Sequence, residues 1–410
     1  MSQQYDVLII GGGLVGATLA CALEPLACLQ GLKIAIVEPR PVDQPQSRPP
    51  SFDARSSALS YGTIQAYEKL GLWSSLAGHA ESIKQVHVSD RGHFGMTRLS
   101  HKKEGVPALG YVIDNFKLGE VLLDRLRCYR KKQTLTLYSP AEVTQLNPTA
   151  GSMLVTLLDS TKKQHDIKAS LVVLADGGRS GLMAQIGIIR DTHDYGQHAL
   201  IANITTDKPH EGVAYERFSR NGPMALLPKK SLIDKPEASL YGLVWTLSED
   251  EINDVISMKA SAVIKKLQDS FGYRAGRFLQ IGHRDSYPLI MGIAREQIRP
   301  NLVVLGNAAH TVHPVAGQGY NLAIRDVMSL ANTIKAAVID RASVGDLHRL
   351  MTYLQKQEAD QKRVVAFCDN LINAFSKNKL PTVMARNMCL LGLDFSSQLK
   401  SHFTKAAMGL

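Results

Sequence analysis

The chain opens with an alternation of buried-strand and helix patterns. Residues 5–10 (YDVLII) form a mostly apolar run, typical of a strand covered on both faces of a parallel sheet. Residues 17–29 carry small and apolar side chains and predict a helix, which Pro25 would kink or shorten. Residues 33–37 predict a second buried strand that ends directly before Glu38. The start of the chain is therefore expected to be a complete βαβ unit.

The middle of the chain predicts a change to antiparallel sheet. Helices are expected over 61–76 and 116–129, and two alternating stretches, 153–158 and 165–174, predict an antiparallel pair. From about residue 190 to 290 short alternating segments dominate, which we interpret as a second domain. Its expected strands span residues 198–205, 213–218, 224–228 and 239–247. Residues 86–90, earlier in the chain, predict a further strand.

The last part of the chain returns to the first pattern. Residues 301–305 (NLVVL) predict another buried strand, residues 321–335 a helix, and residues 345–410 helices without a strand signal. A chain of 410 residues is too long for one simple core. The predicted fold class is α/β (α+β): a parallel-sheet domain, an inserted antiparallel-sheet domain and a helical C-terminus.

Composition and charge narrow the function classes. The chain is 45% hydrophobic and 20% charged, as is usual for a globular enzyme. Its net charge of +10 could indicate nucleic-acid binding, but the basic residues are spread along the chain without an arginine-rich arm. We therefore expect no nucleic acid. A generally basic surface is the simpler interpretation, and attraction to anionic cofactors or an anionic membrane surface stays open.

Several features predict a cytoplasmic protein. No uninterrupted apolar run reaches roughly 18 residues, so no transmembrane helix is expected. The first residues lack the basic and apolar regions of a signal peptide. The cysteines are odd in number and form no C-x-x-C pair, which excludes an obvious disulfide framework or zinc site and fits a reducing compartment. They are Cys21, Cys28, Cys128, Cys368 and Cys389.

A glycine-rich loop follows the first predicted strand. Gly11, Gly13 and Gly16 fit the pattern G-x-G-x-x-G, which permits a tight turn, close approach of backbone to a pyrophosphate, and close helix–strand packing. The following helix would direct its N-terminal N–H groups at the phosphates. Glu38 stands where an acid contacts a ribose hydroxyl. The segment predicts binding of a dinucleotide without a 2′-phosphate, either FAD or NAD(H).

Two further motifs occur later. Residues 175–180 (ADGGRS) follow a predicted strand and by themselves would usually be a turn. Residues 306–321 (GNAAHTVHPVAGQGYN) precede a predicted helix, and Gly317 and Gly319 would let backbone amides approach a ligand. Two such helix N-termini suit a ligand with two phosphates and a remote polar ring system. His310 and His313 lack a nearby third ligand, so no metal is expected.

The three motifs, in this order, resemble those of the class A flavoprotein aromatic hydroxylases, the family of p-hydroxybenzoate hydroxylase. Residues 313–321, followed by Asp326, are similar to the signature of the ubiquinone-biosynthesis hydroxylases. Stretches that are similar to the 2-polyprenyl-6-methoxyphenol hydroxylase branch are 86–93, 216–218 and 222–228. Two positions depart from the family pattern: Asn307 replaces an aspartate and Ala323 replaces a glycine.

The resemblance implies an activity and a domain plan. The protein would be an FAD-dependent monooxygenase that hydroxylates a lipophilic polyprenylated methoxyphenol with NAD(P)H and O₂ through a flavin C4a-hydroperoxide. A Rossmann-like FAD-binding domain would comprise 1–80, 104–185 and 285–345, an antiparallel-sheet substrate domain 81–103 and 186–284, and a C-terminal helical segment 346–410.

The resemblance also implies roles by position. The pyrophosphate and adenosine ribose would be held by Gly11, Gly13, Gly16 and Glu38. The rest of FAD would be bound by Arg55, Asp176, Gly177, Asn307, Gly317, Gln318, Gly319 and Asn321. No catalytic side chain is firmly assigned; the candidates are Arg55, Pro314, which would lie close to the reacting carbon, and Gln318.

The substrate wall is expected on the second sheet. Met224, Leu226 and Pro228 fall on one face of a strand at period two, and Phe218 is close in sequence. They would form an apolar pocket, although plain core packing explains the same pattern equally well.

The C-terminal residues and the overall function each allow more than one interpretation. Residues 384–410 place Met388, Leu391, Phe395, Leu399 and Phe403 at helical spacing with Lys400 and Lys405, which suits a helix packed on its own domain or one touching a membrane or partner. The resemblance allows other ubiquinone-biosynthesis proteins as partners, and peripheral contact with the inner face of the membrane. A flavin reductase or dehydrogenase, or a non-catalytic flavin-binding scaffold, are the alternative functions.

Overall fold

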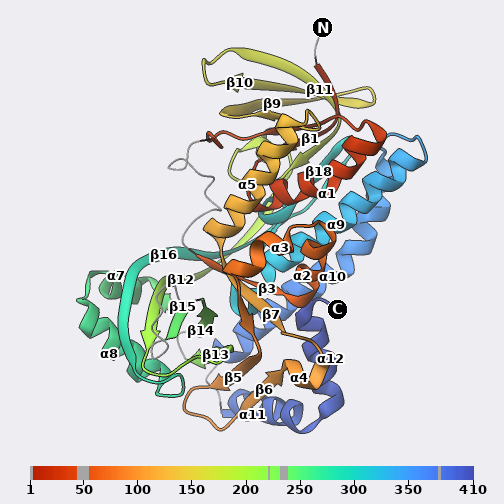
Figure 1. The fold of residues 1–410 in the computed structure, drawn as a ribbon. Helices are drawn as coiled ribbons and strands as arrows, with labels where there is room; N and C mark the ends of the chain where they lie inside the picture. The colour runs from red at the N-terminus through yellow and green to blue at the C-terminus, as the bar shows by residue number, and fades with distance from the viewer. Residues whose placement is uncertain (1–2, 44–54, 220–221, 231–238, 377–379) are drawn as a thin grey trace.

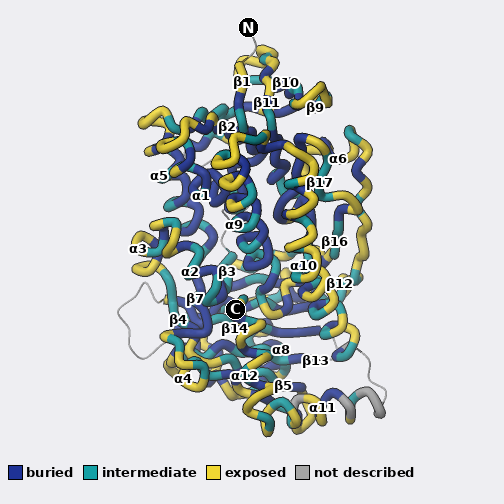
Figure 2. Tube along the Cα trace, turned by 90° about the vertical axis from the view of Figure 1, so that its right-hand side faces the viewer, coloured by how far each residue is buried: buried dark blue, intermediate teal, exposed yellow. Residues whose placement is uncertain are grey.

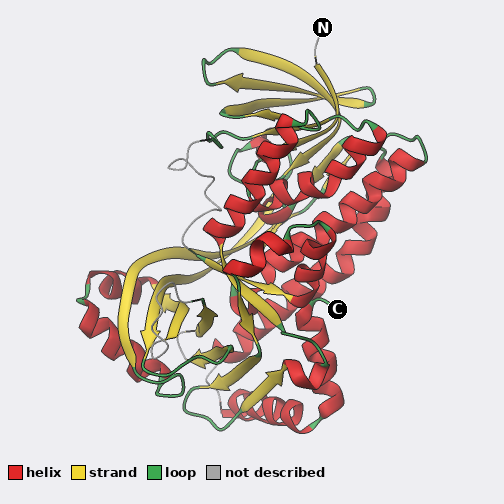
Figure 3. Ribbon diagram, viewed as in Figure 1, coloured by secondary structure: helices red, strands yellow, loops and turns green. Residues whose placement is uncertain are grey.

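The computed structural model describes residues 3–43, 55–219, 222–230, 239–376 and 380–410. Two sheets stand one above the other, and long helices run along one side from the upper sheet to the lower end (Figure 1). The upper sheet contains the N-terminal strand, and the lower one carries two helices on its outer face (Figure 3). The predicted fold class is confirmed.

The upper sheet has a parallel centre. Its strand order is β17-β18-β11-β1-β2-β8, with β10 and β9 added as an antiparallel extension of β11. The pairs around β1, between β2 and β8, and between β11 and β18 are parallel. The strands are β1 (Gln3–Ile10), β2 (Ile34–Val37), β8 (Thr136–Tyr138), β9 (Ala141–Thr149), β10 (Ser152–Asp159), β11 (Gln164–Leu174), β17 (Ile298–Arg299) and β18 (Leu302–Val304).

Helices cover this sheet and form the largest core with it. Buried residues concentrate where α1 and α9 run beside the strands (Figure 2). Their apolar side chains, such as Leu19, Leu23 and Leu330, are completely buried. The helices of this half are α1 (Leu14–Gln30), α2 (Tyr61–Lys69), α3 (Trp73–Leu76), α5 (Asn115–Lys131), α6 (Leu182–Gln185), α9 (Gln318–Ile339) and α10 (Leu347–Ser376).

Three helix predictions need adjustment. Helix α1 runs through Pro25 to Gln30, so the proline neither ends nor shortens it. The helix expected over 61–76 is two helices, because Gly71 adopts φ +65° between them and breaks the ladder. Helix α9 begins at Gln318 rather than near Asn321 and extends to Ile339.

The lower sheet is antiparallel except for the β13–β5 pair. Its order is β19-β16-β12-β15-β14-β13-β5-β6. The strands are β5 (Gln85–Asp90), β6 (Met96–Ser100), β12 (Arg190–Thr206), β13 (Val213–Ser219), β14 (Gly222–Lys229), β15 (Ser239–Ser248), β16 (Phe278–Ala294) and β19 (His310–Thr311). Helices α7 (Glu249–Ser257) and α8 (Ala260–Phe271) pack on one face of this sheet and bury a second core.

Strand β16 and both of these helices were not predicted. Most residues of β16 are half-buried or exposed, and polar residues interrupt it, so it has no clean alternation. Helix α7 does carry a start signal, a capping box between Ser248 and Glu251. Strand β16 continues across residue 285, directly before which the substrate domain was predicted to end. The domain boundaries given above remain a prediction.

A small sheet and the C-terminal helices join the two halves. The small sheet has the order β3-β7-β4, with β3 (Ser56–Ser60), β4 (Glu81–Ile83) and β7 (Gly110–Asp114). The chain ends with α11 (Leu380–Phe395) and α12 (Ser397–Met408), which lie by β6 and α4 (His101–Glu104). The helical C-terminus agrees with the sequence prediction. Among the described residues, no helix combines the length and apolarity that a membrane span requires.

We expect that Leu226→Ala lowers the free energy of unfolding by about 2–5 kcal/mol, because Leu226 is completely buried against the core under α7 and α8. Urea unfolding followed by tryptophan fluorescence measures the change. Leu227→Ala is the matched control: its side chain lies on the opposite face of β14 and is only partly buried, so its cost should be smaller. Equal costs for both variants would contradict this assignment of faces.

Candidate functional site

A cavity of about 1200 Å³ lies between the two sheets. This volume exceeds the roughly 300–1,000 Å³ of a typical small-molecule pocket, so it offers room for a large cofactor and a second molecule. It is lined by the glycine loop after β1, by β3, by the inner face of the lower sheet, by residues 311–321 and by parts of α10, α11 and α12. All three sequence motifs therefore reach one cavity.

The glycine loop is shaped by close backbone contacts. Gly11 has φ +107°, and a Cβ there would lie 2.6 Å from the Ala175 carbonyl oxygen. A Cβ on Gly16 would overlap the Gly11 carbonyl oxygen, so Gly16 lets α1 pack against β1 without lining the cavity itself. Gly11 and Gly13 do line it. The N-terminus of α1, capped by the backbone at Gly13, opens at this point.

Glu38 directly follows β2 beside this loop and is 4% exposed. Its Oε2 accepts from the Gly12 N–H at 2.7 Å and its Oε1 from the Arg40 N–H at 3.1 Å. Burial raises the pKa of this carboxyl, and the two backbone N–H groups oppose that rise. A carboxylate has about four acceptor positions, so it can hold the loop and still accept from a ribose hydroxyl.

The Asp176 segment forms a tight turn after β11. The carboxylate accepts from the Gly178 N–H at 2.9 Å, from the Ser180 N–H at 3.1 Å and from the Ser180 hydroxyl. Gly177 and Gly178 both have positive φ, which the turn requires. Asp176 and Gly177 line the cavity. Their predicted place near a pyrophosphate stays a prediction.

Arg190 connects the second and third motifs and was missed by the sequence reasoning. Its Nη2 donates to the Asn307 carbonyl oxygen at 3.0 Å and to the Thr311 hydroxyl, and its Nη1 lies beside Gly178. Burial lowers its pKa, while Asp176 acts in the opposite direction. Arg190 thus positions the loop that presents Asn307 to the cavity.

The turn before α9 is the tightest part of the third motif. Ala316 and Gly317 have φ +57° and +60°, and α9 starts at the next residue. Gly317, Gln318 and Gly319 line the cavity near the helix N-terminus, where backbone N–H groups and the helix dipole favour negative charge.

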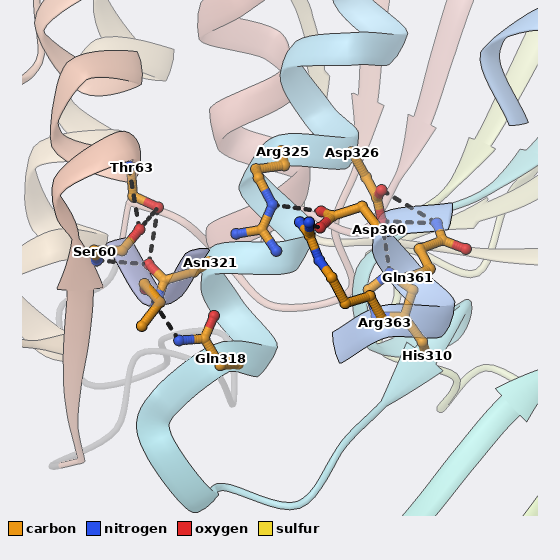
Figure 4. Close-up of polar contacts among 11 residues, drawn as sticks. Ser60, Thr63, His310, Gln318, Asn321, Arg325, Asp326, Asp360, Gln361 and Arg363 are labelled. Carbon is orange, nitrogen blue, oxygen red and sulfur yellow. Dashed lines mark hydrogen bonds and ion pairs between the residues drawn. The ribbon is translucent and has the colours of Figure 1, made fainter. Parts of the chain in front are cut away.

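Asn321 lies in the first turn of α9, but its side chain is fully occupied by protein (Figure 4). Its Oδ1 accepts from the Ser60 N–H and the Thr63 hydroxyl, each at 2.8 Å. Its Nδ2 donates to the carbonyl oxygens of Ala58 at 2.9 Å and Gly317 at 2.8 Å. The amide therefore positions the turn by binding it to β3 and α2. Asn321 also lines the cavity, and its predicted contact with a cofactor stays a prediction.

Gln318 contacts the end of the chain. Its side-chain amide donates to the Ala407 carbonyl oxygen in α12 at 3.2 Å and to the Ala316 carbonyl oxygen at 3.4 Å. The C-terminal helix therefore closes the cavity beside α9. Sequence spacing gave no signal for this contact.

Arg55 and Pro314 both line the cavity, as expected for residues near the reacting end of a flavin. The Arg55 guanidinium lies over the Tyr287 ring at 4.8 Å from its centroid. Its neighbours Asp53 and Ala54 lie outside the described residues.

The two histidines of the third motif have roles within the fold. The His310 Nε2 is 2.6 Å from Asp326 Oδ2, and Gln361 also donates to that carboxylate (Figure 4). His313 lines the cavity; burial lowers its pKa to about 4, and its Nδ1 accepts from the Val315 N–H at 3.2 Å. Within the described ranges, no group of three metal-binding side chains occurs.

Of the residues predicted to line a substrate pocket, Phe218 borders the cavity, whereas Met224, Leu226 and Pro228 do not. Met224 and Leu226 are completely buried in the core under α7 and α8, and they do not line the cavity. Pro228 also lies outside the lining. The alternate residues Ala225 and Leu227 line it, as does Phe218, which stacks on Phe375 at 3.7 Å between centroids. Alternation with a period of two separates the two faces of a strand, but it does not show which face borders the cavity.

The residues present fit FAD. The close approach of loop backbone at Gly11 leaves no room for a side chain, so the phosphates can meet backbone N–H groups directly. Glu38 and the Gly317–Gly319 turn line the same cavity. Two helix N-termini, of α1 and α9, open onto that cavity and suit a diphosphate and an electron-rich ring.

The cavity wall contains residues that the sequence analysis did not select. Glu216 lines it from β13, although the motif around it had been noticed. Further wall residues come from the C-terminal helices, namely Cys389, Leu393, Phe403, Thr404 and Met408. An apolar helix pattern alone could not reveal that its inner face borders a cavity rather than a core.

Known proteins support this interpretation. The family described as "FAD binding domain" matches residues 4–368. The ubiquinone hydroxylase UbiL of Rhodospirillum rubrum is 32% identical over 404 residues, covering 98% of this chain and 89% of its own length. The 3-demethoxyubiquinol 3-hydroxylase of Escherichia coli (strain K12) is 27% identical over 415 residues, covering 100% of both. The structure of p-nitrophenol 4-monooxygenase PnpA from Pseudomonas putida DLL-E4 shares the fold, with a TM-score of 0.78 at 15% identity over 100% of this chain and 99% of its own.

We expect that Gly11→Ala abolishes FAD retention, because the added Cβ would lie 2.6 Å from the Ala175 carbonyl oxygen and displace the loop. The flavin absorbance of the purified protein measures the effect. Gly31→Ala is the control: Gly31 also has positive φ, +69°, but a Cβ there meets nothing within 4 Å. It should retain FAD at a small cost in stability, about 1 kcal/mol. Full flavin occupancy in Gly11→Ala would refute the proposed cradle.

Proposed function

This chain belongs to the family of FAD-dependent monooxygenases that carry this FAD-binding domain, and we propose that it hydroxylates a polyprenylated methoxyphenol in ubiquinone biosynthesis. The observation that carries the proposal is one cavity that is lined both by the glycine loop after β1 and by apolar residues of the lower sheet. Relatives that match along nearly the whole chain are named as ubiquinone hydroxylases or ubiquinone-biosynthesis monooxygenases. Their names differ in the reaction step, so the methoxyphenol step rests on the resemblance of residues 86–93, 216–218 and 222–228.

The chain's own residues supply binding, orientation and exclusion of water. When bound, FAD supplies hydride acceptance from NAD(P)H and activation of O₂. The Gly11–Gly13 backbone and Glu38 would hold its adenosine diphosphate half, and Asp176 and Asn307 would lie along the middle. The backbone at Gly317–Gly319 would face the ring system, where N–H groups stabilise developing negative charge.

The substrate ring would lie on the apolar wall of the lower sheet. Val88, Phe218 and Leu227 line this part of the cavity, and Pro314 lies across from them on the third motif. An apolar wall binds a prenylated ring and keeps water from the reacting atoms. The C-terminal helices extend the wall with Leu393 and Phe403, which offers apolar surface for a prenyl chain.

We expect the purified, FAD-loaded protein to add one oxygen atom from labelled O₂ to a short-chain prenylated methoxyphenol while oxidising NAD(P)H. Mass spectrometry of the product and NAD(P)H absorbance give the two readouts. A control without the phenol should consume NAD(P)H much more slowly. NAD(P)H oxidation without a hydroxylated product would favour a reductase, and flavin binding without any oxidation would favour a non-catalytic scaffold.

The same function makes a strain-level prediction. A strain that lacks this protein should accumulate a prenylated methoxyphenol that is short of one hydroxyl, and the position of the missing hydroxyl identifies the step. Lipid extraction and mass spectrometry measure this. Normal ubiquinone in that strain would overturn the assignment to this route.

A lipid substrate gives the outer face of the C-terminal helices a role. Met388, Phe395 and Leu399 are 66%, 85% and 63% exposed, on the same two helices whose inner residues line the cavity. We propose that this outer apolar face touches an anionic membrane surface, which the chain's net charge of +10 favours.

The double variant Phe395→Asp, Leu399→Asp is expected to reduce co-sedimentation with vesicles of anionic phospholipid by about tenfold or more, because each exposed apolar side chain contributes roughly 1.5–3 kcal/mol on insertion. Leu29→Asp is the matched control, since Leu29 is 79% exposed on α1, away from these helices. Equal pelleting of wild type and both variants would refute the membrane contact.

A further inference from the structure

Glu216 is an acid placed on an apolar wall. It lies in the middle of β13, where its register partners are Val88 on β5 and Ala225 on β14. All three residues line the cavity, and so does Phe218, two positions further along β13. Among the described residues no cation contributes to the electrostatics of this carboxyl, so its loss of hydration costs free energy. Such a cost is typical of a group that serves a ligand.

The backbone beside the predicted flavin ring approaches this carboxyl. The Ala316 N–H lies close enough to the Glu216 carboxyl to lower its pKa, and Ala316 directly precedes the Gly317–Gly319 turn. The Glu216 side chain keeps partial exposure and lines the cavity. The carboxyl therefore lies beside the turn that precedes α9 and borders the space where a substrate ring would lie.

We propose that Glu216 binds the phenolic hydroxyl of the substrate and accepts its proton during hydroxylation. The inference rests on the function proposed above and adds a catalytic residue to it. In the step, the substrate O–H bond breaks, its electron pair stays on the phenol oxygen and enriches the ring, and the proton moves to the Glu216 carboxylate. The electron-rich ring carbon then forms a bond to one oxygen atom of O₂ as the O–O bond breaks. The second oxygen atom leaves as water, and NAD(P)H supplies the two electrons through bound FAD. The displaced ring proton leaves to solvent, and Glu216 returns its proton to the phenol oxygen.

The environment makes this carboxyl a stronger base than an ordinary glutamate. Burial raises its pKa to about 8, and the Ala316 N–H opposes that rise. A phenol has a pKa near 10, as tyrosine does, so the gap between donor and acceptor narrows to about two units. A base of matched pKa that is held within reach contributes about 10²–10⁴-fold to a proton-transfer step.

Other titratable side chains lie at or near the same wall. Burial lowers the pKa of His313 to about 4 and raises those of Tyr195 and Cys368 to about 12. Arg386, on the cavity wall, is paired with Asp90 at 2.8 Å. Asp369 is hydrogen-bonded to Tyr195 at 3.3 Å and does not line the cavity. Compared with His313, Tyr195 and Cys368, Glu216 is the group whose shifted pKa lies near 8.

The test compares Glu216→Gln with Asp369→Asn in the FAD-loaded full chain. Glutamine can still accept from the Ala316 N–H, so fold and FAD content should stay as in wild type, but it cannot take a proton. The wild-type kcat/KM for hydroxylation should rise with pH through about 8, because the ionised form acts as the base. Glu216→Gln should lose this rise and about 10²-fold or more in kcat. Asp369→Asn should retain both.

A binding measurement gives a readout that is independent of turnover. The absorbance change of bound FAD reports the affinity for a short-chain prenylated methoxyphenol and for the same ring with its hydroxyl methylated. Wild type should prefer the free phenol by about tenfold above pH 8, since a hydrogen bond to a charged group is worth roughly this factor, and Glu216→Gln should show no preference.

The outcomes separate the two proposals. If wild type makes no hydroxylated product but still prefers the phenol through Glu216, the proposed function fails and the binding role stands. If wild type hydroxylates and Glu216→Gln keeps its rate and pH profile, the role of Glu216 is overturned. Loss of FAD or of thermal stability in Glu216→Gln alone would likewise overturn it in favour of a purely structural role.

Discussion

The carboxyl ends of three parallel strands meet at one edge of the upper sheet, and the site depends on this arrangement. In the register, Ile10 of β1 stands opposite Leu174 of β11, and Leu174 stands opposite Val304 of β18. The chain leaves each strand into one of the three motifs, which begin at Gly11, Ala175 and Gly306. Segments almost 300 residues apart in sequence thus reach one cavity because parallel strands end on the same side. The glycine at position 11 is required because backbone from the second motif passes directly behind it.

Much of this half could be predicted from the sequence, because the signals are local. Continuous apolar runs gave the parallel strands, and the glycine spacing gave the cradle. The lower sheet was predicted as strands, but its inward face was not. Residues 224 and 226 carry larger apolar side chains than Ala225, and the larger ones fill the core under α7 and α8. Since α7 and α8 were themselves not predicted, we had no reason to expect that this face was already covered.

The contacts that hold the turn before α9 were beyond sequence reasoning for a different reason. Asn321 belongs to a motif and suggested a ligand contact, yet its four hydrogen bonds go to β3, α2 and the turn itself. Gln318 reaches α12 at the end of the chain. The contacts of Asn321 with β3 and α2, and of Gln318 with α12, join residues that are more than 80 positions apart in sequence. No rule of sequence spacing predicts such contacts. Motif membership therefore located these residues correctly but did not distinguish a residue that binds from one that positions.

Three of the acids that line the cavity lie beside backbone N–H groups of a neighbouring loop. Glu38 and Asp176 accept from such groups, and the Ala316 N–H lowers the pKa of Glu216. Holding an acid with backbone N–H groups costs less free energy than burying a charged Lys or Arg side chain beside it. They also leave each carboxyl with acceptor capacity toward the cavity. The surroundings of these acids nevertheless differ. Asp176 accepts three hydrogen bonds within a turn, whereas burial among apolar neighbours raises the pKa of Glu216 to about 8. A fold that uses backbone N–H groups to hold its acids can therefore set one carboxyl for binding and another for proton transfer simply by changing the side chains around it.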